Sequence, residues 1–142
     1  MDYDWFSVIA AGAELSAGAA QALHDVGFFV IPGPVAIDGL AVLAEAYDTA
    51  VASAGLEDVA HGSSTTRVHD FVNRGPEFDG LHVYQPVLEA CSRIITQPFR
   101  LSAMLARTLR PHAQAQALHV DFKPNTDGWP MVGFIFMVDE FR

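Results

Sequence analysis

His119 and Asp121 are the two residues whose types and spacing are best suited to chemistry. They lie two positions apart in an apolar segment that is typical of a β-strand. Side chains two apart on a strand share a face, so this imidazole and carboxylate could reach one metal ion. Two histidines and one carboxylate on one face of an octahedron leave three exchangeable positions, as in non-haem Fe(II) sites. The spacing alone also suits a simpler interpretation, in which His119 is a half-buried strand histidine bonded to Asp121 or to a backbone carbonyl.

The last third of the chain contains the strands that would position this pair. Residues 114–122 are predicted to form the strand that carries it. Residues 131–138 are apolar at both alternating sets of positions, which predicts a central strand covered on both faces. Residues 99–109 are expected to form a further strand because Pro98 and Pro111 bracket them, although their types would also suit a helix.

Three helices are expected in the first two thirds of the chain. Ser16 is suited to cap the first helix, and Gly27 is suited to end it because glycine tolerates the left-handed conformation. Asp38 is expected to cap a second helix whose apolar residues recur at helical spacing up to Gly55. A third helix is predicted to begin near Pro86, since proline fits the first turn.

Short strands and a loop are expected between these helices. Residues 28–31 read as a buried strand and residues 65–71 as another, whereas residues 57–66 are polar and aperiodic, which indicates a loop. Helices come first and strands follow, an order that predicts the α+β class. The length of 142 residues predicts one domain over residues 1–142.

The charge distribution disfavours nucleic-acid binding. The net charge is −9; residues 1–66 carry nine acidic and no basic residues, while residues 67–142 carry eight of each sign. No basic stripe is therefore present to neutralise phosphates. Seven of the eight basic residues are arginines, whose guanidinium fork pairs with carboxylates, so an anionic ligand is expected against the second half.

Other features of the sequence predict a cytoplasmic protein. No apolar run reaches the length of a membrane span, and the acidic start is unlike a secretion signal. Cys91 is the only cysteine, so neither an internal disulfide nor a cysteine-based zinc site can form. Its expected role is that of a small buried residue.

The chain resembles the phytanoyl-CoA dioxygenase family of Fe(II)- and 2-oxoglutarate-dependent oxygenases. The resemblance begins with LHDVGFFVIPGPVAIDGLAVL at 23–43, which is similar to that family's opening helix, strand and following helix. It continues through TTRVHDFVNRGPEF, PVLEACSRIITQPFRLSAML and QALHVDF, and ends in GWPMVGFIFMVDEF at 128–141. The order and spacing of these segments, rather than any single one, carry the resemblance.

The resemblance implies a fold, a metal and a co-substrate. The fold would be a double-stranded β-helix, or jelly roll, with the N-terminal helices packed outside. His119 and Asp121 would be the first two Fe(II) ligands, and Gln116 and Trp129 would line the 2-oxoglutarate pocket. The implied reaction is hydroxylation of a small-molecule substrate with oxidation of 2-oxoglutarate to succinate and CO₂.

The chain departs from the family pattern in its length. Family members run to roughly twice this length, and their second histidine ligand and 2-oxoglutarate-binding basic residue lie beyond the segment similar to 128–141. A truncated or divergent member is therefore expected, whose third ligand comes from this chain, from another subunit, or is lacking. The candidates in this chain are His61, His69, His82 and His112.

Other interpretations stand beside the enzyme, and the plainest of them is an acidic α+β domain without a site. The chain could instead be a non-catalytic family remnant that serves as a binding or assembly domain, a homo-oligomer through an exposed strand edge. Arg67 and Arg100 could bind a substrate anion, although ordinary ion pairs are the simpler expectation for both. His24 is expected to face solvent on its helix.

Overall fold

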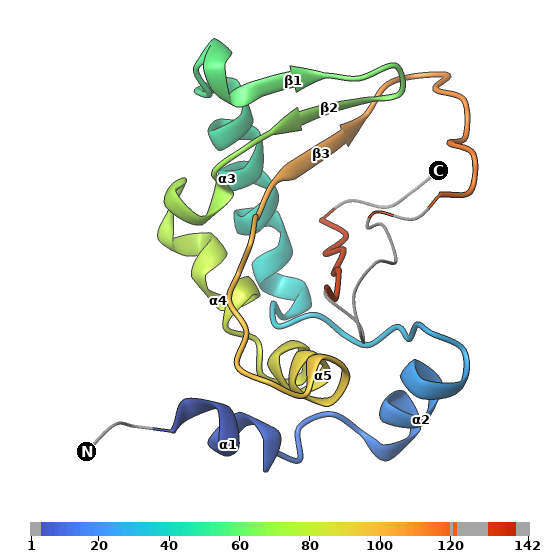
Figure 1. Cartoon of the computed structure of the whole chain (residues 1–142). Helices are drawn as coiled ribbons and strands as arrows, with labels where there is room; N and C mark the ends of the chain where they lie inside the picture. Colours follow the sequence, from blue (N-terminus) through green and yellow to red (C-terminus); the bar gives the residue numbers. More distant parts are fainter. Residues whose placement is uncertain (1–3, 120, 122–130, 139–142) are drawn as a thin grey trace. The chain divides into compact units, whose positions relative to one another are not determined.

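The computed structural model describes residues 4–119, 121 and 131–138 and divides the chain into two compact units (Figure 1). The first unit comprises Met1–Pro34, Val83–Arg100 and Phe122–Phe136, and the second comprises Val35–His82, Leu101–Asp121 and Met137–Arg142. Helices and a three-stranded antiparallel sheet occur together, so the α+β class is confirmed. The expectation of a single domain stays a prediction.

Three helices build the first unit: α1 (Trp5–Ala10), α2 (Ala17–Asp25) and α5 (Gln85–Ile95). The predicted cap of α2 is confirmed, because the Ser16 hydroxyl accepts a hydrogen bond from the backbone N–H of Ala19 at 3.1 Å. Gly27 follows the helix with φ 86°, a conformation that favours glycine, so the predicted end is also confirmed. Pro86 lies in the first turn of α5, as predicted.

Apolar contacts hold the first unit together. Helix α1 packs on α5, and the Trp5 ring meets Phe99 edge-on with centroids 5.3 Å apart. Leu15, Ala19 and Ala90 form a buried cluster. The partly buried residues packed against it are Ala20, Leu23, Phe29 and Ile31.

A buried carboxylate joins α5 to the turn between α1 and α2. Glu89 is 1% exposed, and its two carboxylate oxygens accept hydrogen bonds from the backbone N–H groups of Glu14 at 2.9 Å and Leu15 at 3.0 Å. Gly12 leaves the space that this carboxylate occupies, since a Cβ there would collide with it. Sequence periodicity did not predict this contact, because a glutamate in a helix is ordinarily solvated.

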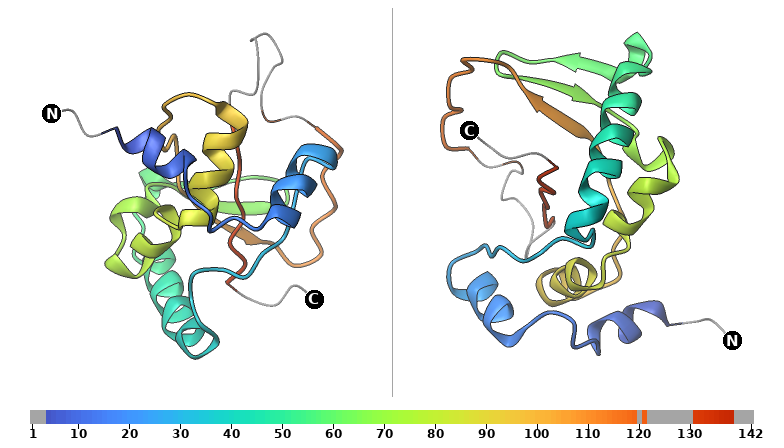
Figure 2. Two further views of the ribbon diagram at one scale, coloured as in Figure 1. Left: turned by 90° about the horizontal axis from the view of Figure 1, so that it is seen from below. Right: turned by 180° about the vertical axis from the view of Figure 1, so that it is seen from behind.

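The second unit is built around a sheet of order β1-β2-β3, formed by β1 (Val59–His61), β2 (Thr65–Val68) and β3 (Ala106–Leu109). Helix α3 (Leu40–Ala52) runs beside the sheet (Figures 1 and 2), where the hydroxyl groups of Tyr47 and Thr108 are 2.9 Å apart. Helix α4 (Asp79–His82) follows two short 3-10 turns. The buried apolar residues of this unit are Leu43, Ala50, Val68, Phe71, Phe78, Leu81 and Ala106.

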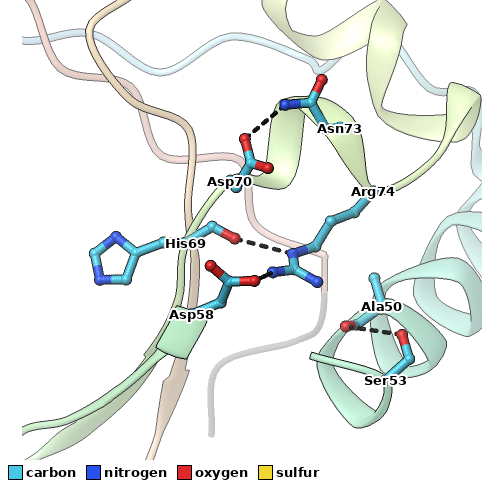
Figure 3. A network of polar contacts seen from close by, with 7 residues as sticks. All are labelled: Ala50, Ser53, Asp58, His69, Asp70, Asn73 and Arg74. Carbon is cyan, nitrogen blue, oxygen red and sulfur yellow. Dashed lines mark hydrogen bonds and ion pairs between the residues drawn. The ribbon is translucent and has the colours of Figure 1, made fainter. Parts of the chain in front are cut away.

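An ion pair fixes the chain where β2 ends (Figure 3). The Arg74 guanidinium donates to Asp58 Oδ2 at 2.7 Å and to the His69 carbonyl at 2.9 Å. The His69 N–H donates to the Asp58 carbonyl at 2.9 Å. Asp58, His69 and Arg74 are therefore linked to one another by three hydrogen bonds. Asp70 has φ 61°, and its carboxylate accepts from the Asn73 amide at 2.7 Å.

Three predictions for the first half of the chain are wrong. Residues 28–31 form no strand, because no described segment pairs with them in a hydrogen-bonded ladder, and Val30 is 77% exposed. Residues 57–66 are not simply a loop: they contain β1, whose residues pair with β2 in the register Val59↔Val68. Helix α3 also begins at Leu40 without a cap from Asp38.

Three predicted strands of the last third are absent or shorter. Only Ala106–Leu109 of residues 99–109 is a strand. In the predicted strand 114–122, residues 114–119 have no regular structure and Asp121 is not in a strand. Val120 and Phe122 lie outside the described residues. Residues 131–138 form no strand, and Ile135 is 83% exposed, so the expectation of a covered central strand is wrong. Among the described residues, no helix has both the length and the apolar character needed to cross a membrane.

Candidate functional site

His119 and Asp121 lie together on the surface of the second unit. His119 Nε2 is 3.5 Å from Asp121 Oδ1, although the segment preceding the pair is not a strand. His119 Nδ1 lies 2.8 Å from the carbonyl oxygen of Ala117. A carbonyl only accepts, so Nδ1 carries the proton and donates. The ring nitrogen left facing the carboxylate is therefore Nε2.

This arrangement places two acceptors opposite each other when the imidazole is neutral. The Nε2 lone pair and the Asp121 oxygen then face each other without a donor, so a water molecule or a cation between them would make the contact favourable. Ligand bonds of about 2.0–2.2 Å at right angles hold two donor atoms about 3 Å apart. The pair thus needs to close by only about 0.5 Å to share one ion.

In metal sites, the ring nitrogen of a ligating histidine that does not bind the metal usually donates to a carbonyl or carboxylate, and His119 Nδ1 makes such a bond to the Ala117 carbonyl. Such partners fix the tautomer and the ring orientation and raise the basicity of the ligating nitrogen. The same contacts also match the simpler interpretation of a histidine bonded to a carbonyl and facing a carboxylate. Burial does not decide between the two, because the side chains of His119 and Asp121 are 54% and 77% exposed.

None of the histidines considered as a third ligand forms a three-residue metal group with this pair among the described residues. His61 Nδ1 is 3.3 Å from the Thr66 hydroxyl on the sheet. His69 is exposed, and its ring points away from the Asp58–Arg74 ion pair (Figure 3). His82 has a buried Nδ1 without a hydrogen-bond partner, and His112 follows β3 with φ 59°. No group of three His, Cys, Asp or Glu side chains suited to a metal occurs among the described residues.

The two residues expected to line a 2-oxoglutarate pocket have different outcomes. Gln116 lines an open depression of about 370 Å³ in the second unit, together with Arg110 and Ser64. It lies three residues before His119 in the chain. Trp129 lies outside the described residues.

Of the other charged residues singled out by the sequence, His24 and Arg100 lie at the surface, whereas Arg67 is partly buried. His24 is exposed, as expected, and its Nδ1 is 2.7 Å from Asp25 Oδ1. The carboxylate of Asp25 also accepts from the Gln21 amide, and these hydrogen bonds, led by that of Gln21, lower the pKa of Asp25. Neither Arg67 nor Arg100 forms an ion pair with a described residue. No sequence pattern predicted the Asp58–Arg74 pair, whose partners lie 16 positions apart in the chain.

Comparison with known proteins adds no relative. No protein-family model matches the chain, and no curated protein or solved structure does so significantly.

Proposed function

We propose that the chain is a non-haem Fe(II)- and 2-oxoglutarate-dependent oxygenase of the phytanoyl-CoA dioxygenase type, acting on a C–H bond of a small molecule. The observation that carries the proposal is the His119–Asp121 pair, in which Nε2 faces the carboxylate at 3.5 Å and Nδ1 is held by the Ala117 carbonyl. The order of the sequence segments similar to that family is its second support. A jelly roll including β1, β2 and β3 is part of the same proposal.

The residues present fit part of an iron site. His119 and Asp121 would hold the ion, and one further donor would come from a residue outside the described ranges or from a second chain. When bound, Fe(II) supplies activation of O₂ coupled to oxidation of 2-oxoglutarate. Gln116 and Trp129 would orient the co-substrate. The proposal places the protein in the cytoplasm, where Cys91 stays a reduced thiol.

Anaerobic calorimetric titration with Fe(II) tests the metal site. The chain is expected to bind one equivalent, and His119→Ala is expected to weaken binding at least about tenfold, since a ligand is lost. His24→Ala is the matched control, because it removes an exposed histidine that also faces an aspartate. Equal affinities in the wild type and His119→Ala would overturn the assignment of His119.

Turnover is measured separately, as 2-oxoglutarate-dependent release of succinate in the presence of Fe(II) and O₂. Release that depends on both His119 and Asp121 is the expected result. Stoichiometric Fe(II) binding without any succinate would retain the metal site and reject the oxygenase.

One observation favours a second candidate, a non-catalytic binding or oligomerisation domain. Strands β1 and β3 each pair with β2 alone among the described residues, and Ile135 and Met137 are 83% and 60% exposed. Unpaired strand edges and exposed apolar side chains favour association of copies. Light scattering coupled to size-exclusion chromatography tests this candidate, and a monomer across the working concentrations would reject it.

A further inference from the structure

The second unit contains an open depression at the end of its sheet. It has a volume of about 710 Å³ and is lined by the strand residues Thr65, Arg107 and Leu109, by Ser64, and by residues 110–116. An adjoining hollow of about 370 Å³ shares Ser64 and residues 110–116 and adds Ser63. Volumes of this size suit a small-molecule ligand.

The depression is positively charged in a strongly acidic chain. Arg107 and Arg110 belong to its lining, whereas no Asp or Glu does so among the described residues. The chain as a whole carries a net charge of −9. Neither arginine forms an ion pair with a described residue, so the two guanidinium groups are available to an anion.

The sheet register adds a third guanidinium to the same face. Arg67 lies directly opposite Arg107 across the β2–β3 ladder, and directly opposed residues project from one face of a sheet. Like charges in such a pair destabilise it. Arg67 Nε is moreover buried without a hydrogen-bond partner, and a buried unpaired donor is costly. An anion over this face would offset the repulsion between the opposed arginines.

Two serines that line the depression, Ser63 and Ser64, carry hydroxyl groups that can donate hydrogen bonds to an anion. The Arg110 N–H donates to the Ser64 carbonyl at 3.0 Å, and the Ala113 N–H donates to the Arg110 carbonyl at 3.1 Å. These bonds keep the Ser63-Ser64 turn beside the segment that follows β3. Serine hydroxyls donate to oxyanions, and guanidinium forks bind them in a bidentate manner.

We infer that this depression binds the phosphate group of a small molecule. Arg107 and Arg110 match the two charges of a phosphate dianion, and the hydroxyls of Ser63 and Ser64 supply further donors. The inference goes beyond the proposed iron chemistry and uses neither His119 nor Asp121, although the depression includes Gln116, the residue proposed to orient 2-oxoglutarate. Measurements in EDTA therefore separate its failure from failure of the metal site.

Two-dimensional ¹H–¹⁵N NMR of the isotopically labelled chain, titrated with inorganic phosphate in EDTA at constant ionic strength, tests the inference. Saturable shifts are expected at residues 63–65 and 107–116, with a dissociation constant on the order of 1 mM. Arg107→Gln and Arg110→Gln should each weaken binding about ten- to one-hundredfold, because each removes a charged donor. Arg100→Gln is the matched control, since Arg100 is an exposed arginine of the first unit and should leave affinity unchanged.

Each other outcome overturns the inference. Absence of saturation up to about 50 mM phosphate would reject the site. Equal losses in Arg100→Gln and Arg110→Gln would reduce binding to general charge attraction. Tighter binding of succinate than of phosphate at the same residues would reject a phosphate site in favour of a dicarboxylate site. Retained dispersion of the amide spectrum shows for each variant that the chain is folded.

Discussion

Replacing Glu89 by glutamine tests how much one buried carboxylate contributes to the first unit. Wild-type Glu89 accepts one backbone N–H at each oxygen, from Glu14 at 2.9 Å and from Leu15 at 3.0 Å. Glutamine keeps one oxygen and replaces the other with an amide group that can only donate. The N–H of Leu15 is the more buried of the two and is expected to keep the oxygen, so the N–H of Glu14 loses its acceptor.

The expected loss follows from the single hydrogen bond that is removed. A hydrogen bond to a charged group contributes about 1.5–3 kcal/mol, and one such bond is lost while the other becomes neutral. The free energy of unfolding should therefore fall by about 2 kcal/mol. Glu89→Ala removes both acceptors and should lower it by about 3–5 kcal/mol. Arg93 contributes little, because its guanidinium is 3.9 Å from Glu89 and 43% exposed.

Urea denaturation followed by far-UV circular dichroism measures these differences at fixed m-value. Glu45→Gln, an exposed change on α3, is the matched control and should stay within about 0.5 kcal/mol of the wild type. A Glu89→Gln variant as stable as the wild type would refute the argument that the two N–H groups depend on this carboxylate.

Three further predictions concern space, a thiol and a helix cap. Gly12→Ala should lower the free energy of unfolding by about 1–3 kcal/mol, because the new Cβ collides with Glu89. Gly18→Ala in α2 meets nothing within 4 Å and should raise the free energy of unfolding by about 0.5–1 kcal/mol. Urea titration measures both changes. Burial raises the pKa of the Cys91 thiol from 9.0 to about 11; its contribution to stability is present below pH 9 and is lost as pH rises toward 11. Iodoacetamide at pH 8 should therefore modify the thiol only after unfolding, and rapid labelling of the native chain would contradict its burial. The hydrogen bond from Ser7 lowers the pKa of Asp4 from its usual value of 3.8. The cap of α1 is therefore present above pH 3.8 and is lost as the pH falls through the lowered pKa. The NMR shift of the Ser7 amide, followed during acid titration, measures this loss, and Asp4→Asn should abolish the pH dependence of that shift.

Local signals in the sequence predicted the features that depend on neighbouring residues. Ser16 caps α2, Gly27 ends it and Pro86 opens α5, because each effect acts within one helical turn. The proximity of His119 and Asp121 was also predicted, although from a strand that the structure does not contain.

Features that depend on distant partners were not predictable. Strand β1 exists through its ladder with β2. Residues 131–138 have the apolar types of a strand but pair with no other described segment. The buried position of Glu89 depends on a gap left by Gly12, far away in the chain, which no periodicity reveals. The Arg67–Arg107 juxtaposition likewise appears only once the register of β2 and β3 is known.

The two hydrogen bonds of Glu89 join residues 75 and 74 positions apart in the chain, and this separation bears on the kinetics of folding. Closing so long a loop costs entropy before any contact compensates for it, so we predict that these bonds form after the rate-limiting step and have φ-values near zero. Their loss would then act on unfolding rather than on folding: a loss of about 2 kcal/mol would speed unfolding about thirtyfold. The carboxylate of Glu89 would thus set how long the first unit stays folded once formed, while leaving the time needed to reach that state almost unchanged.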